Sequence, residues 1–319
     1  MKTLFENCTL CPRRCAVNRL ANERGVCGES ADLRIADIEA HFGEEPPISG
    51  NRGSATIFFS GCSLKCCYCQ NYQISSGGLG EHVTIFEIVQ KLEALFTSAR
   101  VHNINFVTPD HFLPQTIEIA RLARQRAIHI PILYNLSGYQ TTDSLKLIES
   151  RADIYLPDFK YAGSALAQRY STAANYPEIA IPAIEEMIRQ KGFLSCTHDE
   201  TDGIELATKG VLVRHLILPG HVRNSLDALT MLFIEFGADL PLSLMSQYQP
   251  IAANLPDDLN RQVTPDEFNL VYEHATKLGF KLMYTQFPPR ECEECTSEYL
   301  PDFSNAIPFA GNINRGKKD

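Results

Sequence analysis

The stretch GSATIFFSGCSLKCCYCQN, residues 53–71, decides the fold of this chain. Its first part, residues 54–61, is a run of β-branched and aromatic side chains that predicts a buried strand. Cys62, Cys66 and Cys69 follow directly after that strand in the spacing C-x3-C-x2-C. In an α/β barrel the ends of the strands carry the reactive residues, so we expect this loop to face the functional site.

The three cysteines predict an iron–sulfur cluster. Three thiolates on a short loop hold three irons of a [4Fe–4S] cubane and leave the fourth iron without a protein ligand. Zinc would need a fourth ligand, for which Cys67 is the spare thiol. Adjacent side chains in extended backbone point apart, so we expect Cys67 to pack elsewhere. The open iron suits a chelating ligand, such as the amino and carboxylate groups of methionine.

Strands and helices alternate from residue 54 onwards. Strands are predicted at residues 54–61, 104–107, 129–135, 153–160, 210–220, 240–248 and 280–285. Helices are predicted at residues 84–98, 114–125, 142–150, 177–191, 225–236 and 264–278, with Thr84 and Thr264 as N-caps. This alternation indicates βαβ units and a parallel sheet. The expected fold is a partial (β/α)6 TIM-like barrel, and a doubly wound open sheet is the alternative.

A Cys-rich module and linker, residues 1–50, precedes the predicted core at residues 51–290 and a polar tail at residues 291–319. The boundary is placed at GEEPPISG, residues 43–50, where paired prolines indicate a turn or a stiff linker. Within the module, four cysteines share the pattern C-x2-C-x3-C-x11-C: Cys8, Cys11, Cys15 and Cys27. Four thiolates suffice for a structural zinc or a second iron–sulfur cluster, and a metal-free cysteine cap is the alternative. Cys292 and Cys295 lie among glutamates, whose charge raises thiol pKa values, and their role stays open.

The cluster loop resembles that of the radical SAM superfamily, because an aromatic residue, Tyr68, stands just before the third cysteine. Within it, the chain is similar to the pyruvate-formate-lyase-activating-enzyme-like subgroup. The similar stretches span nearly the whole chain: residues 7–19, 43–50, 53–75, 103–114, 133–139, 153–161, 212–220 and 243–250. This resemblance implies one-electron cleavage of S-adenosylmethionine (SAM) to a 5′-deoxyadenosyl radical, which abstracts hydrogen from a substrate.

The resemblance also implies a set of SAM-binding residues, with none catalytic beyond the cluster. They are Tyr68 near the adenine, Asp158 and Lys160 in an Asp-x-Lys pattern, Arg214 on the fifth strand, and Gln249 in place of a histidine near the ribose. Asn135, at the end of the third strand, is a further polar candidate. The turn VTPDH, residues 107–111, replaces a Gly-Gly-Glu turn, so Thr108, Asp110 or backbone carbonyls would contact the SAM amino group.

Composition limits the other possibilities. The chain has 319 residues and a formal net charge of −9, which argues against a broad nucleic-acid-binding surface. It has no apolar run long enough to span a membrane and no secretory signal at its start. The short cysteine spacings indicate metal binding in a reducing compartment, so a cytoplasmic location is expected.

The expected partners are SAM, a low-potential electron donor and, as one option, a protein substrate. Activation of a glycyl-radical enzyme is one interpretation, and direct chemistry on a small molecule or a protein side chain is another. The alternative from a different class is an iron–sulfur electron carrier or cluster-delivery protein without SAM turnover. Such a carrier would not need the polar residues at the strand ends.

Overall fold

Eleven strands make up the sheets of this chain. They are β1 (Arg34–His41), β2 (Ser54–Phe59), β3 (Glu81–His82), β4 (Ile104–Val107), β5 (Ile132–Leu136), β6 (Ile154–Pro157), β7 (Ser195–Asp199), β8 (Ile204–Val211), β9 (Val213–Leu216), β10 (Leu242–Met245) and β11 (Met283–Gln286). The structure, a computed structural model, describes residues 3–252, 255–288, 300–305 and 307–309, and these counts refer to them. One sheet has the strand order β3-β1-β2-β4-β5-β6-β8-β7 and the other β11-β10-β9.

The parallel strands form one curved surface. β2, β4, β5 and β6 pair in parallel in that order, and β9, β10 and β11 pair in parallel in the smaller sheet. A parallel bridge between Asp158 and Arg214 joins the two sheets at the end of β6. The architecture is therefore a partial TIM-like barrel, as predicted, rather than a doubly wound sheet.

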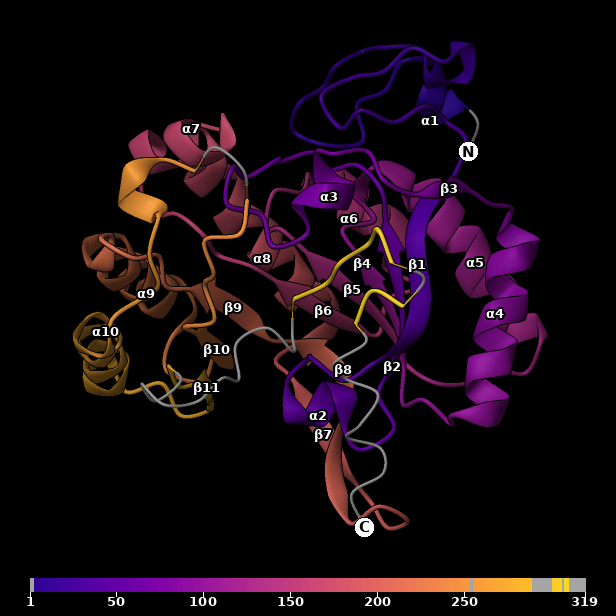
Figure 1. Cartoon of the computed structure of the whole chain (residues 1–319). Coiled ribbons are helices and arrows are strands. Elements are labelled where there is room, and N and C mark those ends of the chain that lie inside the picture. The colour runs from indigo at the N-terminus through magenta and orange to yellow at the C-terminus, as the bar shows by residue number, and fades with distance from the viewer. Residues whose placement is uncertain (1–2, 253–254, 289–299, 306, 310–319) are drawn as a thin grey trace.

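The longer helices cover the outside of this curve, whereas α1 lies in the N-terminal module above it (Figure 1). The helices are α1 (Thr3–Glu6), α2 (Pro46–Ser49), α3 (Tyr72–Ser75), α4 (Ile85–Ser98), α5 (Leu113–Gln125), α6 (Thr142–Ile148), α7 (Ser164–Ser171), α8 (Tyr176–Lys191), α9 (Val222–Phe236) and α10 (Pro265–Leu278), with 3-10 turns η1 (Arg19–Ala21), η2 (Asp110–Phe112) and η3 (Asp257–Leu259). The predicted N-caps are confirmed: Thr84 and Thr264 each accept the amide of a glutamate three residues on, and that glutamate bonds back to the cap amide.

Three strand regions were not predicted: the two-residue β3, β1, and the β7–β8 hairpin as far as residue 209. β1 pairs antiparallel with β2, with Ile38 opposite Ile57, although residues 1–50 were expected to stand apart from the core. Its apolar side chains Ile35 and Ile38 are buried, while Asp37 and Glu39 next to Ile38 hide the strand pattern. The β7–β8 hairpin is polar and extends beyond the barrel at the foot of Figure 1, so it lacks the apolar alternation by which strands are detected.

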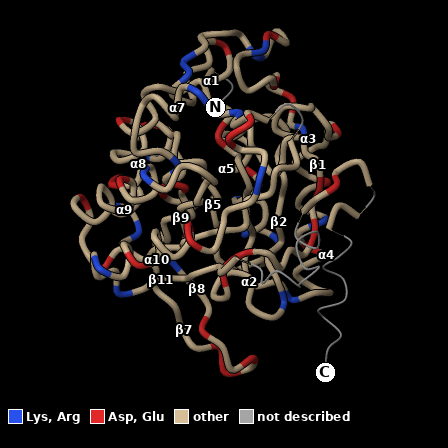
Figure 2. Tube along the Cα trace, turned by 60° about the vertical axis from the view of Figure 1, so that its left-hand side comes forward, with Lys and Arg blue, Asp and Glu red and all other residues tan. Residues whose placement is uncertain are grey.

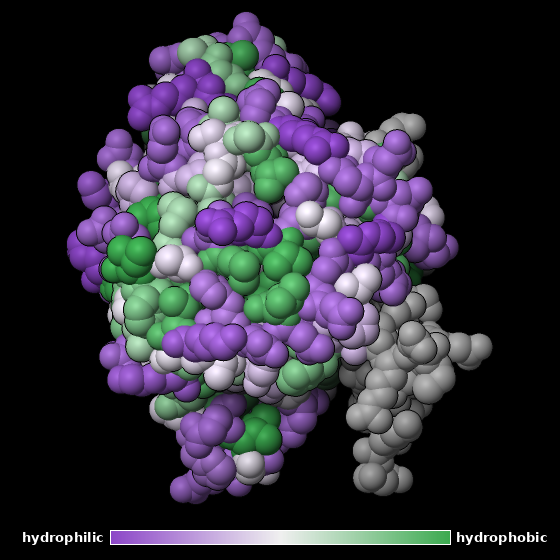
Figure 3. Space-filling model, turned by 90° about the vertical axis from the view of Figure 1, so that its left-hand side faces the viewer, coloured by the Kyte–Doolittle hydropathy of each residue, from purple (hydrophilic) through white to green (hydrophobic). Residues whose placement is uncertain are grey.

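The outer surface is of mixed character. Acidic and basic residues are interspersed over most of the chain (Figure 2). Apolar side chains gather on the face that carries α9 and α10 (Figure 3), where Ile234 and Leu270 are exposed. No helix among the described residues is long and apolar enough to cross a lipid bilayer.

The described part of the C-terminal segment crosses the open front of the barrel, as the yellow trace of Figure 1 shows. Phe309 stacks on Phe58 of β2, with ring centroids 5.2 Å apart. Gln73 holds the same segment through Asp302 and the amide of Phe303, each at 2.8 Å. Residues 300–305 and 307–309 therefore pack on the core, whereas the sequence predicted a polar tail. Cys292 and Cys295 lie outside the described residues.

Candidate active site

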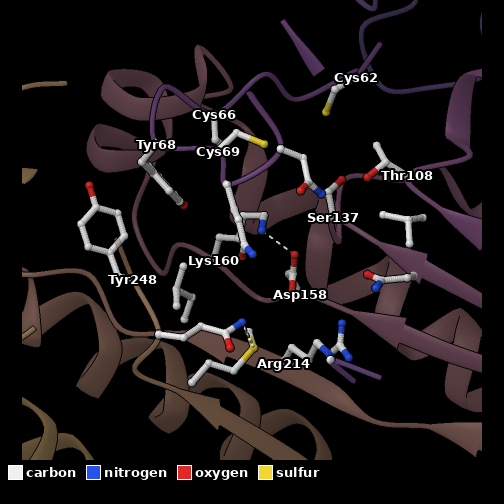
Figure 4. A pocket seen from close by; sticks show the side chains of 18 of the residues that line it. Cys62, Cys66, Tyr68, Cys69, Thr108, Ser137, Asp158, Lys160, Arg214 and Tyr248 are labelled. Atoms are coloured by element: carbon white, nitrogen blue, oxygen red, sulfur yellow. Dashed lines mark hydrogen bonds and ion pairs between the residues drawn. The ribbon is translucent and has the colours of Figure 1, made fainter. Parts of the chain in front are cut away.

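One cavity of about 230 Å³ lies at the carboxyl ends of the barrel strands. It brings together every core residue predicted for the site: Cys62, Cys66, Tyr68, Cys69, Asn135, Asp158, Lys160, Arg214 and Gln249 all line it. In Figure 4 the cysteines stand on one side of the cavity, with Lys160 and Asp158 facing them and Arg214 beyond. Residues from six strand ends thus meet at one place, as expected for a barrel of this kind.

The cluster loop presents its sulfur atoms as hydrogen-bond acceptors. Sγ of Cys62 accepts the amides of Leu64 and Lys65, at 3.3 and 3.4 Å, and Sγ of Cys66 accepts the hydroxyl of Ser171 at 3.1 Å. Burial, with the neighbouring cysteine thiols, raises the pKa of Cys62 to about 12. Deprotonated cysteines at this buried place would therefore need a cationic group to stabilise them. The N–H and O–H donors around the sulfur atoms suit an iron–sulfur cluster.

Cys67 has a different environment from the three cysteines beside it. Its amide donates to the carbonyl of Tyr170 at 2.8 Å, and the residue is absent from the cavity lining within the described part of the chain. It therefore packs elsewhere, as adjacent side chains in a loop of this kind were expected to do.

Lys160 and Asp158 form an ion pair at the centre of the cavity. Both side chains are mostly buried. Burial alone would lower the pKa of Lys160, but the charge of Asp158 and the nearby Cys66 sulfur raise it overall. The ammonium group therefore stays charged beside the cysteines. This is a partner for a negative group on a bound ligand.

Arg214 has two carboxylate partners that the sequence did not reveal. Its guanidinium bonds Glu45 through Nε at 2.8 Å and contacts Glu44 as well. Glu44 also accepts the side-chain amides of Asn105 and Asn135, at 2.7 and 3.3 Å. Burial would raise the pKa of Glu44, yet Arg214 lowers it overall, so the carboxylate is charged. Both glutamates belong to GEEPPISG, which had been assigned to a linker.

Aromatic residues form the wall of the cavity that lies away from Asp158 (Figure 4). Tyr68 is buried and makes edge-to-face contacts with Tyr161, Tyr170 and Tyr248, whose ring centroids lie 6.4, 6.1 and 6.2 Å away. Tyr248 also lines the cavity. Its neighbour Gln249 is fixed by an amide hydrogen bond of 2.6 Å from Gln262. A flat apolar ligand group would find a rigid surface here.

The turn after β4 separates the two candidates for the SAM amino group. Thr108 lines the cavity and has a φ of 54°, a left-handed conformation that is rare for a β-branched residue and costly to hold. Asp110 does not line the cavity within the described residues. It is buried and bonded to Gln140, and burial raises its pKa to about 6. Ser137, which the sequence did not single out, faces the cavity beside Thr108 (Figure 4).

The geometry agrees with the family comparison, in which residues 56–204 match the model of the radical SAM superfamily. The matched range contains β2 from Thr56 onward, the cluster loop, Asn135, Asp158 and Lys160. This part of the chain is therefore similar to the radical SAM superfamily domain.

Individual relatives are more distant. An uncharacterized protein of Methanocaldococcus jannaschii is 29% identical over 293 residues, which cover 89% of this chain and 78% of that protein. Two structures of native anSMEcpe, one with bound AdoMet and one with AdoMet and the Kp18Cys peptide, are 12% identical, with TM-scores of 0.49 and 0.48. The similarity covers 71% of this chain but only 61% and 60% of those chains, so this chain spans less than two thirds of their length.

Proposed function

We propose that this protein is a radical SAM enzyme. The observation that carries the proposal is the single cavity in which Cys62, Cys66 and Cys69 meet the polar residues of the later strand ends. Chemical logic supports it: an iron–sulfur electron carrier needs a cluster loop, but it has no use for a buried charged cavity beside that loop. The family match over residues 56–204 points the same way.

The residues present fit a [4Fe–4S] cluster and SAM. Cys62, Cys66 and Cys69 would hold three irons and leave the fourth open to the amino and carboxylate groups of SAM. The bound cluster supplies the electron that splits SAM into methionine and a 5′-deoxyadenosyl radical. Around it, Lys160 pairs with the SAM carboxylate and Tyr68 packs near the adenine.

The other predicted contacts follow from their places in the cavity. Thr108, rather than Asp110, is positioned for the SAM amino group, because only Thr108 faces the cavity. Asn135 and Gln249 offer side-chain amides to the sugar hydroxyls. Arg214 holds Glu44 toward the ligand, and its charge is shared between that residue and Glu45.

The substrate is the least constrained part of the proposal. Activation of a glycyl-radical enzyme and direct hydrogen abstraction from another protein or small molecule both suit the cavity. A low-potential one-electron donor is required in either case. We also infer that the four N-terminal cysteines bind a metal, as zinc or a second cluster, and that the protein works in the reducing cytoplasm.

The test is SAM cleavage by the full chain after anaerobic reconstitution with iron and sulfide. Reduced with dithionite and given SAM, the protein should form 5′-deoxyadenosine, measured by liquid chromatography with mass spectrometry. Cys66→Ala should abolish both the product and the absorbance of that cluster. The neighbouring Cys67→Ala is the matched control and should keep both. A reconstituted, reduced protein that makes no 5′-deoxyadenosine would favour the electron-carrier alternative.

A further inference from the structure

The N-terminal module gathers four sulfur atoms that are all set up as acceptors. Cys8, Cys11, Cys15 and Cys27 are free thiols. Each sulfur atom accepts one N–H group: Arg19 Nη1 at Cys8 (3.8 Å), the amide of Arg13 at Cys11, the amide of Val26 at Cys15 (3.4 Å) and the amide of Glu29 at Cys27. The sulfur atom of Cys62 in the cluster loop likewise accepts backbone amides. Amide donors around sulfur stabilise thiolates and thus favour a metal-bound state.

A buried positive charge stands beside these sulfur atoms. Arg19 is 1% exposed and lies against the rings of Phe5 and Phe112, 4.6 and 5.4 Å from their centroids. Its protein acceptors are the carbonyls of Ser30 and His111 and the sulfur of Cys8. Within the described ranges no carboxylate oxygen lies within 4.0 Å of its nitrogens. A buried guanidinium needs a negative partner, and a thiolate-ligated metal group supplies one.

The spacing of the sulfur atoms favours a cluster over zinc. Four thiolates around one zinc stand about 3.8 Å apart, as follows from a Zn–S distance of about 2.3 Å in a tetrahedron. Among the residues described, one group of three possible metal ligands has all its ligand atoms within 4.8 Å of one another, and it consists of His102, Asp199 and Asp202. The cysteines of the module do not form such a group. Arg52 already neutralises those two aspartates, at 3.2 and 2.8 Å. Cysteines that each ligate a different iron stand farther apart than zinc ligands do, which suits a set in which no three sulfur atoms all lie within 4.8 Å of one another among the described residues.

The module is joined directly to the cluster loop. The amide of Cys62 donates to the carbonyl of Cys27 at 3.3 Å, so one hydrogen bond links a ligand of each set. Arg13 adds bonds from its guanidinium to the carbonyls of Ser63 at 2.9 Å and Ser171 at 2.8 Å. Blue segments, which mark Lys and Arg, are visible in the N-terminal module of Figure 2, and the sequence of this module has Arg13, Arg14, Arg19 and Arg24 between Cys11 and Cys27.

We propose that Cys8, Cys11, Cys15 and Cys27 bind a second [4Fe–4S] cluster that passes electrons to the cluster on Cys62, Cys66 and Cys69, with Arg19 as its buried countercharge. This role rests on the proposed function, because only SAM cleavage consumes the electrons. Each turnover takes one electron from a low-potential one-electron donor protein through the module. That electron breaks the sulfur–C5′ bond of SAM, giving methionine and the 5′-deoxyadenosyl radical, and no proton moves.

Counting iron separates this proposal from the function of the core. The triple variant Cys62→Ala, Cys66→Ala, Cys69→Ala, reconstituted anaerobically, should retain about four iron and four sulfide ions per chain, with an electron paramagnetic resonance signal after reduction. The complementary variant Cys11→Ser, Cys15→Ser should fall from about eight irons to about four and still cleave SAM with dithionite. One zinc per chain and no iron in the triple variant, or an unchanged iron content in the double variant, would overturn the proposal.

The role of Arg19 has its own readout. Arg19→Gln should lower the midpoint potential of the N-terminal cluster in a spectroscopically monitored titration, because it removes a positive charge near the sulfur atoms. Arg24→Gln is the control, since Arg24 is exposed and its guanidinium donates to the carbonyl of Gly28 at 3.3 Å. An equal shift in both variants, or none in Arg19→Gln, would refute the countercharge role. If the wild-type protein carries both clusters but does not cleave SAM, the result would instead count against the proposed function.

Discussion

Replacing Arg214 by methionine should destabilise the protein by about 3–5 kcal/mol, the usual cost of breaking a buried ion pair. The side chains of Arg214, Glu44 and Glu45 are 9, 8 and 7% exposed. Methionine keeps most of the apolar stem but removes the guanidinium. Two carboxylates then remain buried close together with no positive partner, and both their desolvation and their mutual repulsion oppose folding.

Arg189→Met provides a matched control on the surface. Arg189 also bonds one glutamate twice, Glu186 at 2.8 Å, and reaches a second, Glu149, at 3.1 Å. Arg189 and Glu149 are 54% and 42% exposed, however, and Glu186, which is 9% exposed, keeps a hydrogen bond of 2.8 Å from the side-chain amide of Gln190. We expect a loss of at most about 1 kcal/mol.

Urea unfolding of the metal-free, reduced proteins measures both changes. The chain has no tryptophan, so far-UV circular dichroism is the suitable signal. Adding Glu44→Gln and Glu45→Gln to Arg214→Met should restore part of the lost free energy, because no uncompensated charge is left buried. Equal losses for Arg214→Met and Arg189→Met would refute the reasoning, since both arginines bond two glutamates but only Arg214 and both of its partners are buried.

Three further predictions concern stability. Burial lowers the pKa of His215 from 6.5 to about 4, so between these pH values His215 is neutral in the folded protein and protonated in the unfolded chain. The free energy of unfolding should therefore fall by up to about 3 kcal/mol as the pH falls from about 6.5 to 4. In a plot of the urea midpoint against pH, His215→Gln should have a smaller slope over this range. Thr84→Ala should cost about 1 kcal/mol in urea unfolding through loss of the α4 cap, whereas Thr97→Ala, on the exposed last turn, should change stability by less than about 0.5 kcal/mol. Phe309→Ala should weaken docking of residues 300–305 and 307–309 by about 3 kcal/mol, seen as faster limited proteolysis there with little change in α4 or the sheet.

Much of the fold follows from local sequence signals. Apolar runs predicted the parallel strands, and the caps at Thr84 and Thr264 placed two helix starts correctly. β1 escaped because Asp37 and Glu39 interrupt its apolar residues, and only pairing with β2 makes it a strand. A strand of this kind is stabilised by its partner strand, and the periodicity of its own residues does not reveal that partner.

The same limit applies to the candidate site. The cysteines and strand-end residues are recognisable one by one, because each has a motif or a place after a strand. Glu44 and Glu45 are not, because their role depends on Arg214, which lies 170 residues after Glu44 in the sequence. A Glu-Glu pair before two prolines looks like a solvated linker until the fold buries it.

These carboxylates change which cation is available to a ligand. Arg214 is saturated on two sides by Glu44 and Glu45, so a ligand carboxylate would have to displace a buried, paired group at high cost. Lys160 has a single carboxylate partner, Asp158, and its ammonium retains two further donors. Under the proposed function, a bound SAM carboxylate would therefore pair with Lys160 while Asp158 stays in place. The proposal then gives the two cations different roles: Arg214 fixes Glu44 and Glu45 at the edge of the cavity, and Lys160 would contact the ligand.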